Sequence, residues 1–314
     1  AIGAGIFSGR YTSTIVGPGY LAKKILADLG IRVVSYVKEL AGVHCPPVDV
    51  KKIIKYTDDY KRMRHDHDPF YQEIYVKKRI TPDMRFLEKM AVLAKVEKEI
   101  PKIRKKAPAF NAAGIKRKYK VHAVLNCPDI DAAEEMVAAC NRISATGDSA
   151  GGLVEVVVTG MPAGVGEPVF DKLDGELGKL MGIGAVKGVE VGAGFATKDM
   201  TGYECNDQMR SEKGKVVFDS NNAGGITGGV TTGQDIIIRV AVKPTPTIDR
   251  AQHTIDKYTL KNKMLEAITR RDPTMVARIW PVAENYTAMI LLDHLIAQFG
   301  YQKLLGLYNK PSKK

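Results

Sequence analysis

The segment from Asp235 to Val242 has the pattern of a buried β-strand, and it limits the folds that the chain can adopt. Its three consecutive isoleucines and its valines favour extended backbone, and so continuous an apolar run predicts cover on both faces. A polar, glycine-rich loop at 221–233 precedes the run, and Lys243-Pro244-Thr245-Pro246-Thr247 follows it. A buried strand needs partner strands and covering helices, so the rest of the chain should supply both.

Strand-like and helical segments alternate along the rest of the chain. Further strands are expected where branched residues cluster, at 31–37, 121–125, 153–159 and 186–191. Helices are expected where apolar residues recur at helical spacing between glycine or proline signals, at 20–29, 82–100, 129–143, 167–180 and 282–299. Asp129 is the expected cap of the third helix. This alternation predicts an α+β or α/β layered fold.

The composition excludes several classes of protein. Hydrophobic residues make up 45% of the 314 residues and charged residues 26%, which excludes a wholly disordered, collagen-like or coiled-coil chain. Four scattered cysteines without a CxxC pair argue against a disulfide framework and for a reducing, cytoplasmic location. The longest apolar run, from Met289 to Ile296, is interrupted by Asp293 and His294, so we expect no membrane-spanning segment.

The charge balance favours anionic partners. The chain has 47 Lys and Arg against 35 Asp and Glu, a formal net charge of +12. Basic residues are most concentrated at 102–120, a stretch without acidic residues that we interpret as part of a solvated insertion. It contains no recognisable nucleic-acid-binding module, so nucleic acid is not an expected partner.

The acidic and histidine-rich segment His65-Asp66-His67-Asp68 resembles a metal-ligand cluster. An extended backbone would place His65 and His67 on one face. No further ligand is near in the sequence, and Pro69 follows, so we interpret the segment as a solvated loop and expect no metal.

The loop at 221–233 is the first candidate binding segment. Its glycines would let the backbone approach a flat ligand or a phosphate closely, and successive N–H groups can bind anions. It is not a Walker loop, because no Gly-Lys-Ser/Thr follows, and it is not a Rossmann fingerprint. A flexible turn without a ligand is the alternative.

Two charged segments are further candidates. Lys243-Pro244-Thr245-Pro246-Thr247 offers a cation and hydroxyl groups at a strand end, which would suit an anionic ligand, although it could simply be a proline-rich strand exit. Arg270-Arg271-Asp272-Pro273 places two guanidinium groups beside one carboxylate. Asp272 could accept a proton, or it could form a structural salt bridge near a helix start.

Taken together, ordered blocks of sequence resemble the chorismate synthase family. The resemblance covers residues 1–44 and about 121–299, and the order of the blocks makes it specific. The matching blocks are Phe7-Ser8-Gly9-Arg10, Gly147-Asp148-Ser149-Ala150-Gly151-Gly152, the stretch from Met161 to Asp171, Ala185-Val186-Lys187-Gly188-Val189-Glu190, Ser220-Asn221-Asn222-Ala223-Gly224-Gly225, Lys243-Pro244-Thr245, Arg271-Asp272-Pro273 and Pro281-Val282-Ala283-Glu284.

The resemblance implies both a fold and a reaction. It implies an α+β fold built as a layered β-α-β sandwich, a homotetramer and a requirement for reduced FMN. The implied reaction is the anti-1,4-elimination of phosphate from 5-enolpyruvylshikimate 3-phosphate to give chorismate, the last common step of the shikimate pathway. Because substrate and flavin are both anionic, the basic balance of the chain agrees with this reading.

The resemblance also assigns roles to residues. The implied flavin contacts are Ser8, Gly184, Ala185, Gly228, Lys243, Pro244, Thr245, Pro246, Thr247 and Arg270. Arg10 and Arg271 would bind substrate. Asp272 would be catalytic, relaying a proton near flavin N5. Several positions depart from the family pattern: Gly184 stands where many members have Asn, Ile6 replaces an Arg, and Asn222 and Arg271 each replace a His.

Two histidine motifs of the family, Gly-Glu-Ser-His-Gly and Pro-Gly-His-Ala-Asp, do not occur in the sequence and would lie upstream of Ala1. We therefore expect one domain over residues 1–314, truncated at its N-terminus, with an insertion at about residues 46–120. Two functions stay open: the FMN-dependent lyase, and a catalytically impaired flavin- or anion-binding relative or fragment. An RNA-binding protein using residues 102–120 is a third, weaker alternative.

Overall fold

The computed structural model describes residues 9–67, 125–266 and 272–300, together with scattered residues between 77 and 99. The chain divides into two compact units: Ala1–Pro46 with Glu134–Lys314 forms unit 1, and Pro47–Ala133 forms unit 2. Unit 2 begins next to the start of the expected insertion at 46–120. That these residues are an insertion relative to the family stays a prediction.

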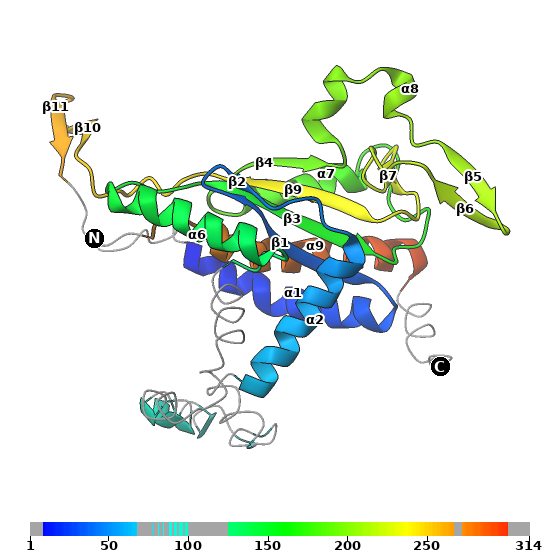
Figure 1. Ribbon diagram of the computed structural model, residues 1–314, viewed down its shortest axis with the longest axis horizontal. Coiled ribbons are helices and arrows are strands. Elements are labelled where there is room, and N and C mark those ends of the chain that lie inside the picture. Colours follow the sequence, from blue (N-terminus) through cyan, green and yellow to red (C-terminus); the bar gives the residue numbers. More distant parts are fainter. Residues whose placement is uncertain are drawn as a thin grey trace. The chain divides into compact units, whose positions relative to one another are not determined.

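Unit 1 is built on one five-stranded sheet, which lies across the centre of Figure 1. All its neighbouring strands are antiparallel. The predicted strands at 31–37, 153–159, 186–191 and 235–242 are all present. In spatial order the strands are β2 (Val43–His44), β1 (Arg32–Leu40), β3 (Gly152–Thr159), β9 (Ile236–Val242) and β4 (Val186–Val191).

Two long helices cover one face of this sheet. α1 (Ser13–Asp28) and α9 (Val276–Phe299) pack against each other, and α9 also packs on β1 and β3 (Figure 1). The helices cross closely at Gly19, where a Cβ atom would lie 2.5 Å from the Cβ of Asn285. Only glycine fits at such a crossing. The strand residues beneath α9, such as Val156 and Ile238, are fully buried and form the core.

The opposite face of β9 is less covered than the sequence predicted. Burial alternates along this strand, with Ile236 and Ile238 buried and Ile237, Arg239 and Ala241 half-buried. The expectation of cover on both faces is therefore wrong for β9. The apolar run concealed the alternation because Ile237 and Ala241, on the less covered face, are themselves apolar.

Both long helices begin earlier than predicted. α1 begins at Ser13 instead of Tyr20 and contains Pro18, and α9 begins at Val276 instead of Val282 and contains Pro281. The prolines suggested breaks, but burial of the contact face between the two helices outweighs the missing backbone hydrogen bond. The predicted helix ends are close to those observed, and Gly300 after α9 has φ +71°.

The predicted helix at 167–180 is largely wrong. Residues up to Lys172 are irregular, α7 spans only Leu173–Leu177, and the 3-10 helix η5 (Gly178–Gly182) continues it. Three glycines between 175 and 182 lower the α-helical propensity of this stretch. The helix after Asp129 is confirmed: α6 spans Ile130–Ala145, and the Asp129 carboxylate accepts a hydrogen bond from the N–H of Ala132 at 2.8 Å.

Short elements add to the described part of unit 1. Among them are the 3-10 and α-helical turns η2 (Gly9–Thr12), η6 (Gly194–Asp199) and α8 (Gly202–Cys205). Three two-stranded hairpins are formed by β5 (Met209–Glu212) with β6 (Lys215–Phe218), β7 (Ile226–Thr227) with β8 (Val230–Thr231), and β10 (Gln252–Ile255) with β11 (Asn262–Leu265).

Unit 2 contains α2 (Val50–His67), in which Ile53 and Tyr56 are buried. His65 and His67 are helical, so the interpretation of this segment as a loop is wrong for them, while Asp68 lies outside the described residues. The predicted helix at 82–100 and strand at 121–125 lie largely outside the described residues.

The α+β class is confirmed. Of the expected β-α-β sandwich, the described residues show one sheet and the helical layer on it. Within the described residues, no helix combines the length and the apolar character needed to cross a lipid bilayer.

Candidate functional site

Four segments that are far apart in the sequence meet at the C-terminal end of β9. We call this place the Lys243 corner, and it consists of residues 147–152, 182–185, 243–247 and 272–273. The backbone N–H of Lys243 donates to the carbonyl of Ala185 at 2.9 Å, and the Ser149 hydroxyl donates to the carbonyl of Thr245 at 2.7 Å. These bonds fix the exit of β9 between the start of β3 and the start of β4.

Asp272 and Pro273 join the corner from the start of α9. The Thr245 hydroxyl donates to the carbonyl of Asp272 at 3.1 Å, and the N–H of Ala150 donates to the carbonyl of Pro273 at 2.8 Å. Gly151 permits this packing, because a Cβ atom there would lie 2.6 Å from the carbonyl oxygen of Val242. The sequence prediction that Lys243–Thr247 and Asp272 belong to one place agrees with these contacts.

The side chains of the corner suit an anionic group. Lys243 is exposed at the strand exit, and the Tyr11 hydroxyl reaches the corner by donating to the carbonyl of Gly182 at 3.1 Å. A Cβ atom added at Gly182 would meet nothing within 4 Å, and one added at Gly184 would meet only the Tyr11 hydroxyl, at 4.0 Å. The corner thus combines a cation and a hydroxyl with open space.

Asp272 has an ion-pair partner that the sequence did not suggest. Its Oδ1 lies 2.9 Å from Nη2 of Arg278, in the first turns of α9. Asp272 was expected beside the guanidinium groups of Arg270 and Arg271, which lie outside the described residues. The observed pair resembles the alternative of a salt bridge at a helix start.

Other predicted site residues lie elsewhere or cannot be placed. Ser8 lies outside the described residues, and Arg10 belongs to η2. Gly228 is not joined to the corner by any described contact: it lies in the turn between β7 and β8, next to Gly229, whose carbonyl accepts from the N–H of Leu173 at 3.1 Å. The 221–233 loop enters β9 at the end opposite to Lys243.

The 221–233 loop is held by its own polar side chains and by Asp207. The Asp207 carboxylate accepts hydrogen bonds from the N–H groups of Asn222 and Ala223, at 2.6 and 2.9 Å, and from the Ser220 hydroxyl at 2.6 Å. The Asn221 side chain donates to the carbonyl of Asp235 at 2.8 Å. These hydrogen bonds hold the start of the loop against Asp207 and Asp235.

A cavity of about 830 Å³ lies beside this loop, and we call it the loop cavity. Apolar side chains from β4, β5 and β6 line it together with polar groups of the loop. The lining includes Val191, Met209, Val216, Phe218, Asn222 and Gln234. A second cavity of about 780 Å³ shares Val216, Phe218 and Gln234 with it.

Protonation of Asp207 should weaken the 221–233 loop. Burial alone raises the pKa of Asp207, but the hydrogen bonds from Ser220, Ala223 and Asn222 outweigh it and lower the pKa below its ordinary value of 3.8. A lowered pKa contributes stability that is present above pH 3.8 and lost as the pH falls through the folded-state pKa. We expect Asp207→Asn to lower the melting temperature at pH 7 and to flatten the fall of the melting temperature as the pH drops below 3.8. Asp199→Asn, at an exposed site, is the control and should change neither.

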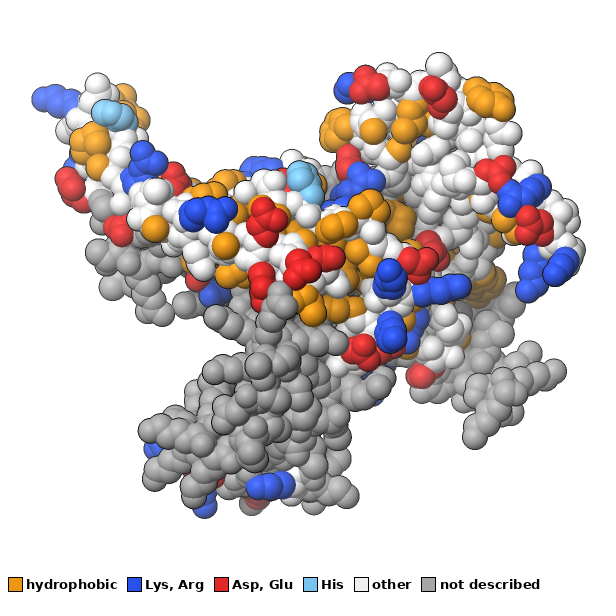
Figure 2. All heavy atoms as spheres, in the orientation of Figure 1, with side chains coloured by type: hydrophobic (Ala, Val, Ile, Leu, Met, Phe, Trp, Pro, Cys, Tyr) orange, Lys and Arg blue, Asp and Glu red, His pale blue; other side chains and the backbone are white. Residues whose placement is uncertain are grey.

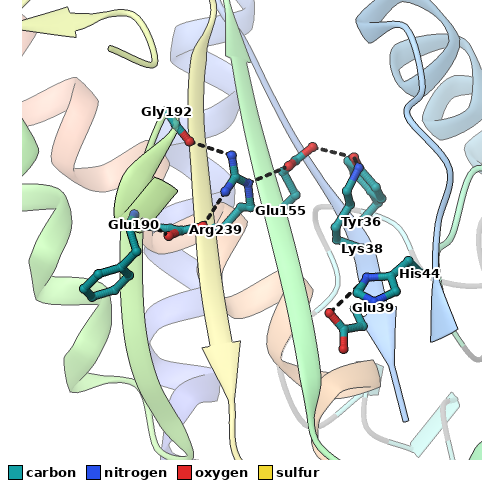
Figure 3. A network of polar contacts seen from close by, with 9 residues as sticks. Tyr36, Lys38, Glu39, His44, Glu155, Glu190, Gly192 and Arg239 are labelled. Atoms are coloured by element: carbon teal, nitrogen blue, oxygen red, sulfur yellow. Dashed lines mark hydrogen bonds and ion pairs between the residues drawn. The ribbon is translucent and has the colours of Figure 1, made fainter. Parts of the chain in front are cut away.

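A row of polar side chains crosses the half-buried face of the sheet, as Figure 3 shows. Tyr36, Glu155, Arg239 and Glu190 stand on four adjacent strands in register. The Tyr36 hydroxyl donates to Glu155, and Arg239 forms ion pairs with both Glu155 and Glu190. We call these four residues the polar row.

The polar row also fixes the wall of the loop cavity. Arg239 donates to the carbonyl of Gly192, and the second oxygen of Glu190 accepts from the N–H of Phe195 at 3.1 Å. Gly194, which lines the cavity, lies between these two anchored residues in the sequence. The row thus connects the centre of the sheet to η6.

Comparison with known proteins decides the family. The family model described as chorismate synthase matches residues 1–296. The chain belongs to the chorismate synthase family.

Curated members of the chorismate synthase family resemble the chain over most of its length. The chorismate synthase of Methanosarcina acetivorans is 37% identical over 295 residues, which are 94% of this chain and 64% of the relative. That of Acetivibrio thermocellus is 37% identical over 96% of this chain and 62% of its own length. The chain thus spans less than two thirds of the length of these relatives. A solved structure titled as a chorismate synthase has a TM-score of 0.60 at 22% identity, and the match covers 96% of this chain and 68% of that one.

Asp207, Arg278 and the polar row escaped sequence reasoning. Nothing near Asp207 or Arg278 in the sequence pointed to their partners, which lie at least six residues away in loops. Among the described residues, no three His, Cys, Asp or Glu side chains are grouped so that they could hold a metal ion.

Gly192 follows β4 and lies against the 221–225 segment. Its substitution tests whether this close approach is needed for stability. It has φ +61°, and a Cβ atom would lie 2.1 Å from the carbonyl oxygen of Asn222. Gly214 has φ +75° but no neighbouring atom within 4 Å. Gly214→Ala should cost about 1 kcal/mol from backbone strain alone. Gly192→Ala should cost about 1–2 kcal/mol more, measured by urea unfolding, because the loop must move. Equal costs would contradict this.

Proposed function

We propose that the chain acts as a chorismate synthase, eliminating phosphate from 5-enolpyruvylshikimate 3-phosphate to give chorismate with reduced FMN as cofactor. The observation that carries the proposal is the Lys243 corner, where four sequence blocks of the family meet within hydrogen-bond distance. The curated relatives from Methanosarcina and Acetivibrio thermocellus bear the enzyme's name, which supports the lyase over a non-catalytic flavin- or anion-binding relative.

The residues of the corner fit a phosphate-bearing flavin. Lys243 would bind an anionic group of FMN through its exposed ammonium group, with Thr245 and Thr247 beside it on a segment stiffened by Pro244 and Pro246. The small residues Gly184 and Ala185 leave space for a flat ring system. Reduced flavin, when bound, would supply electron density as phosphate leaves and so assist the elimination.

The chain's own residues would bind the substrate and accept or steer the proton that it loses. The reaction breaks the C–O bond to phosphate and the C–H bond at C6, and it causes no net oxidation. Asp272 would hold a carboxylate at the edge of the corner, where it accepts or steers the departing proton. Arg10, Arg270 and Arg271 would bind the substrate and flavin anions as the resemblance implies. Ser8 and Gly228 would also contact the flavin, as the resemblance implies, although no described contact joins Gly228 to the corner. We also propose a cytoplasmic homotetramer.

The direct test is an anaerobic assay of the 314-residue chain with chemically reduced FMN and 5-enolpyruvylshikimate 3-phosphate. Chorismate and phosphate should appear in equal amounts. Flavin binding without product would favour the non-catalytic relative, and the absence of both would overturn the proposal.

Lys243→Ala should weaken FMN binding. Loss of one charge-assisted contact is expected to cost about 1–3 kcal/mol of binding free energy, measured by equilibrium titration with reduced flavin. Lys213→Ala, an exposed lysine in the β5–β6 turn, removes the same charge and is the matched control. Equal affinities for the two variants would remove Lys243 from the flavin site.

A further inference from the structure

Tyr11 brings a phenol ring to the Lys243 corner from the first described turns of the chain. Its hydroxyl donates to the carbonyl of Gly182 at 3.1 Å, across 171 positions of sequence. The Thr14 hydroxyl donates to the carbonyl of Tyr11 at 2.6 Å and so ties η2 to the first turn of α1. Tyr11 is nevertheless 41% exposed. An aromatic residue that is anchored in this way and still partly exposed is accessible to a ligand.

The space beside the Tyr11 hydroxyl is open. Leaving out chain neighbours, a Cβ atom at Gly184 would meet only this hydroxyl within 4 Å, at 4.0 Å, and one at Gly182 would meet nothing. The hydroxyl therefore borders a gap that the side chains of the 182–185 segment leave unfilled.

The 182–185 segment also offers backbone donors. Within the described parts of the chain, no group accepts a hydrogen bond from the N–H of Gly184 or of Ala185, and both residues are half-buried. Ala185 has φ +75°, in the left-handed region that favours glycine, and its carbonyl is held by the N–H of Lys243. Successive N–H groups in such a turn can bind an oxygen atom of a ligand, and backbone strain is common at binding sites.

The Tyr11 hydroxyl can still accept a hydrogen bond. A hydroxyl has one proton to donate, which here goes to Gly182, and two lone pairs that can accept. A ligand group that pairs an N–H with a neighbouring carbonyl would satisfy both this oxygen and the free backbone donors. The pyrimidine edge of a flavin has this pattern, because its N3–H lies between the carbonyls at C2 and C4. The opposite edge of the ring carries methyl groups and offers no such pair.

Hydrogen bonds of this kind would determine which edge of the ring faces Tyr11. A contact between Lys243 and an anionic group of FMN fixes one end of the ligand and leaves the orientation of the ring open. On the face of unit 1 that Figure 2 shows, Lys and Arg side chains are interspersed with Asp and Glu, so charge alone does not mark out one binding place on that face. Orientation requires directional contacts.

We propose that Tyr11 is a positioning residue for the flavin ring. Its hydroxyl oxygen accepts a hydrogen bond from the flavin N3–H, and the N–H groups of Gly184 and Ala185 donate to the adjacent carbonyl. The inference rests on the proposed function, because it takes FMN as the ligand of the Lys243 corner. Tyr11 orients the ring and transfers no proton.

The test compares reduced FMN with reduced FMN that is methylated at N3. Tyr11→Phe keeps the aromatic ring and removes only the oxygen. Tyr203→Phe, at a tyrosine of α8 that is 78% exposed, is the matched control. Anaerobic equilibrium titration measures the affinity of each protein for both flavins, and the melting temperature without flavin checks the fold.

The natural chain and Tyr203→Phe should bind FMN equally well, and methylation should weaken binding to both by about tenfold or more, because it removes the N3–H and crowds the hydroxyl. Tyr11→Phe should bind FMN about five to ten times more weakly than the natural chain, and methylation should then cost no more than about threefold. A natural chain that binds no FMN would overturn the proposed function and this inference together. If the natural chain binds FMN, unchanged affinity in Tyr11→Phe, or an equal loss on methylation in both proteins, would overturn the inference alone.

Discussion

Asp272→Asn is expected to lower the turnover of phosphate elimination by about a hundredfold or more while leaving FMN affinity nearly unchanged. Asparagine has almost the same shape as aspartate but cannot accept a proton, so the variant removes the proposed proton transfer and little else. Turnover comes from the anaerobic chorismate assay, and FMN affinity comes from equilibrium titration.

Arg278→Met provides the matched control for this prediction. Both variants break the 2.9 Å ion pair, but only Asp272→Asn removes the carboxylate. The side chains of Asp272 and Arg278 are 41% and 65% exposed, so the pair itself should contribute only about 0–1 kcal/mol to stability. Arg278→Met should therefore leave turnover and melting temperature close to those of the natural chain. Equal losses of turnover in both variants would show that the ion pair, and not the carboxylate, matters.

Arg239→Met is expected to lower the free energy of unfolding by about 3–4 kcal/mol. Arg239 is the only cation of the polar row, and its loss would deprive Glu155 and Glu190 of the ion pairs that they form with it. The side chains of these two glutamates are only 12% and 23% exposed. Breaking a largely buried ion pair from one side leaves an uncompensated charge, which costs more than the pair contributes. Urea unfolding measures the change.

Two further variants test whether the loss of stability in Arg239→Met comes from the broken ion pairs of the polar row. Arg210→Met removes an arginine that pairs with Glu212 and Asp219 on the exposed β5–β6 hairpin, and it should cost less than about 1 kcal/mol. Adding Glu155→Gln to Arg239→Met should recover part of the loss, because one of the stranded charges is then neutral. If Arg239→Met costs no more than Arg210→Met, the polar row is not a source of stability.

The strands could be predicted from the sequence because local pattern determines them. Valines dominate 153–159 and recur at 186, 189 and 191, and β-branched residues are enriched in strands. The polar row could not be predicted, because Glu155, Arg239 and Glu190 come from three strands and meet only through register.

Helix starts were less predictable than helix ends. Gly30 and Gly300 mark the ends locally through backbone with positive φ. The start of α1 before Pro18, by contrast, depends on contact with α9. Tertiary packing decides such cases, and a local signal such as proline does not.

The Lys243 corner was predicted in part, through the family resemblance. Thr245 and Asp272 do meet, yet Arg278 as the partner of Asp272 could not be foreseen, because the ion pair depends on how α9 begins. Gly228 was grouped with Lys243 although the two flank opposite ends of β9. The roles of these residues remain predictions.

The pairing of α1 with α9 sets an order of events on the ribosome. Lys23 of α1 forms an ion pair with Glu284 of α9, and these helices are among the first and last elements of the described chain. At about 5–20 residues per second, roughly 10–50 s separate their synthesis. During that interval the core face of β1 and β3 lacks its α9 cover, and the nascent protein offers a hydrophobic surface to chaperones.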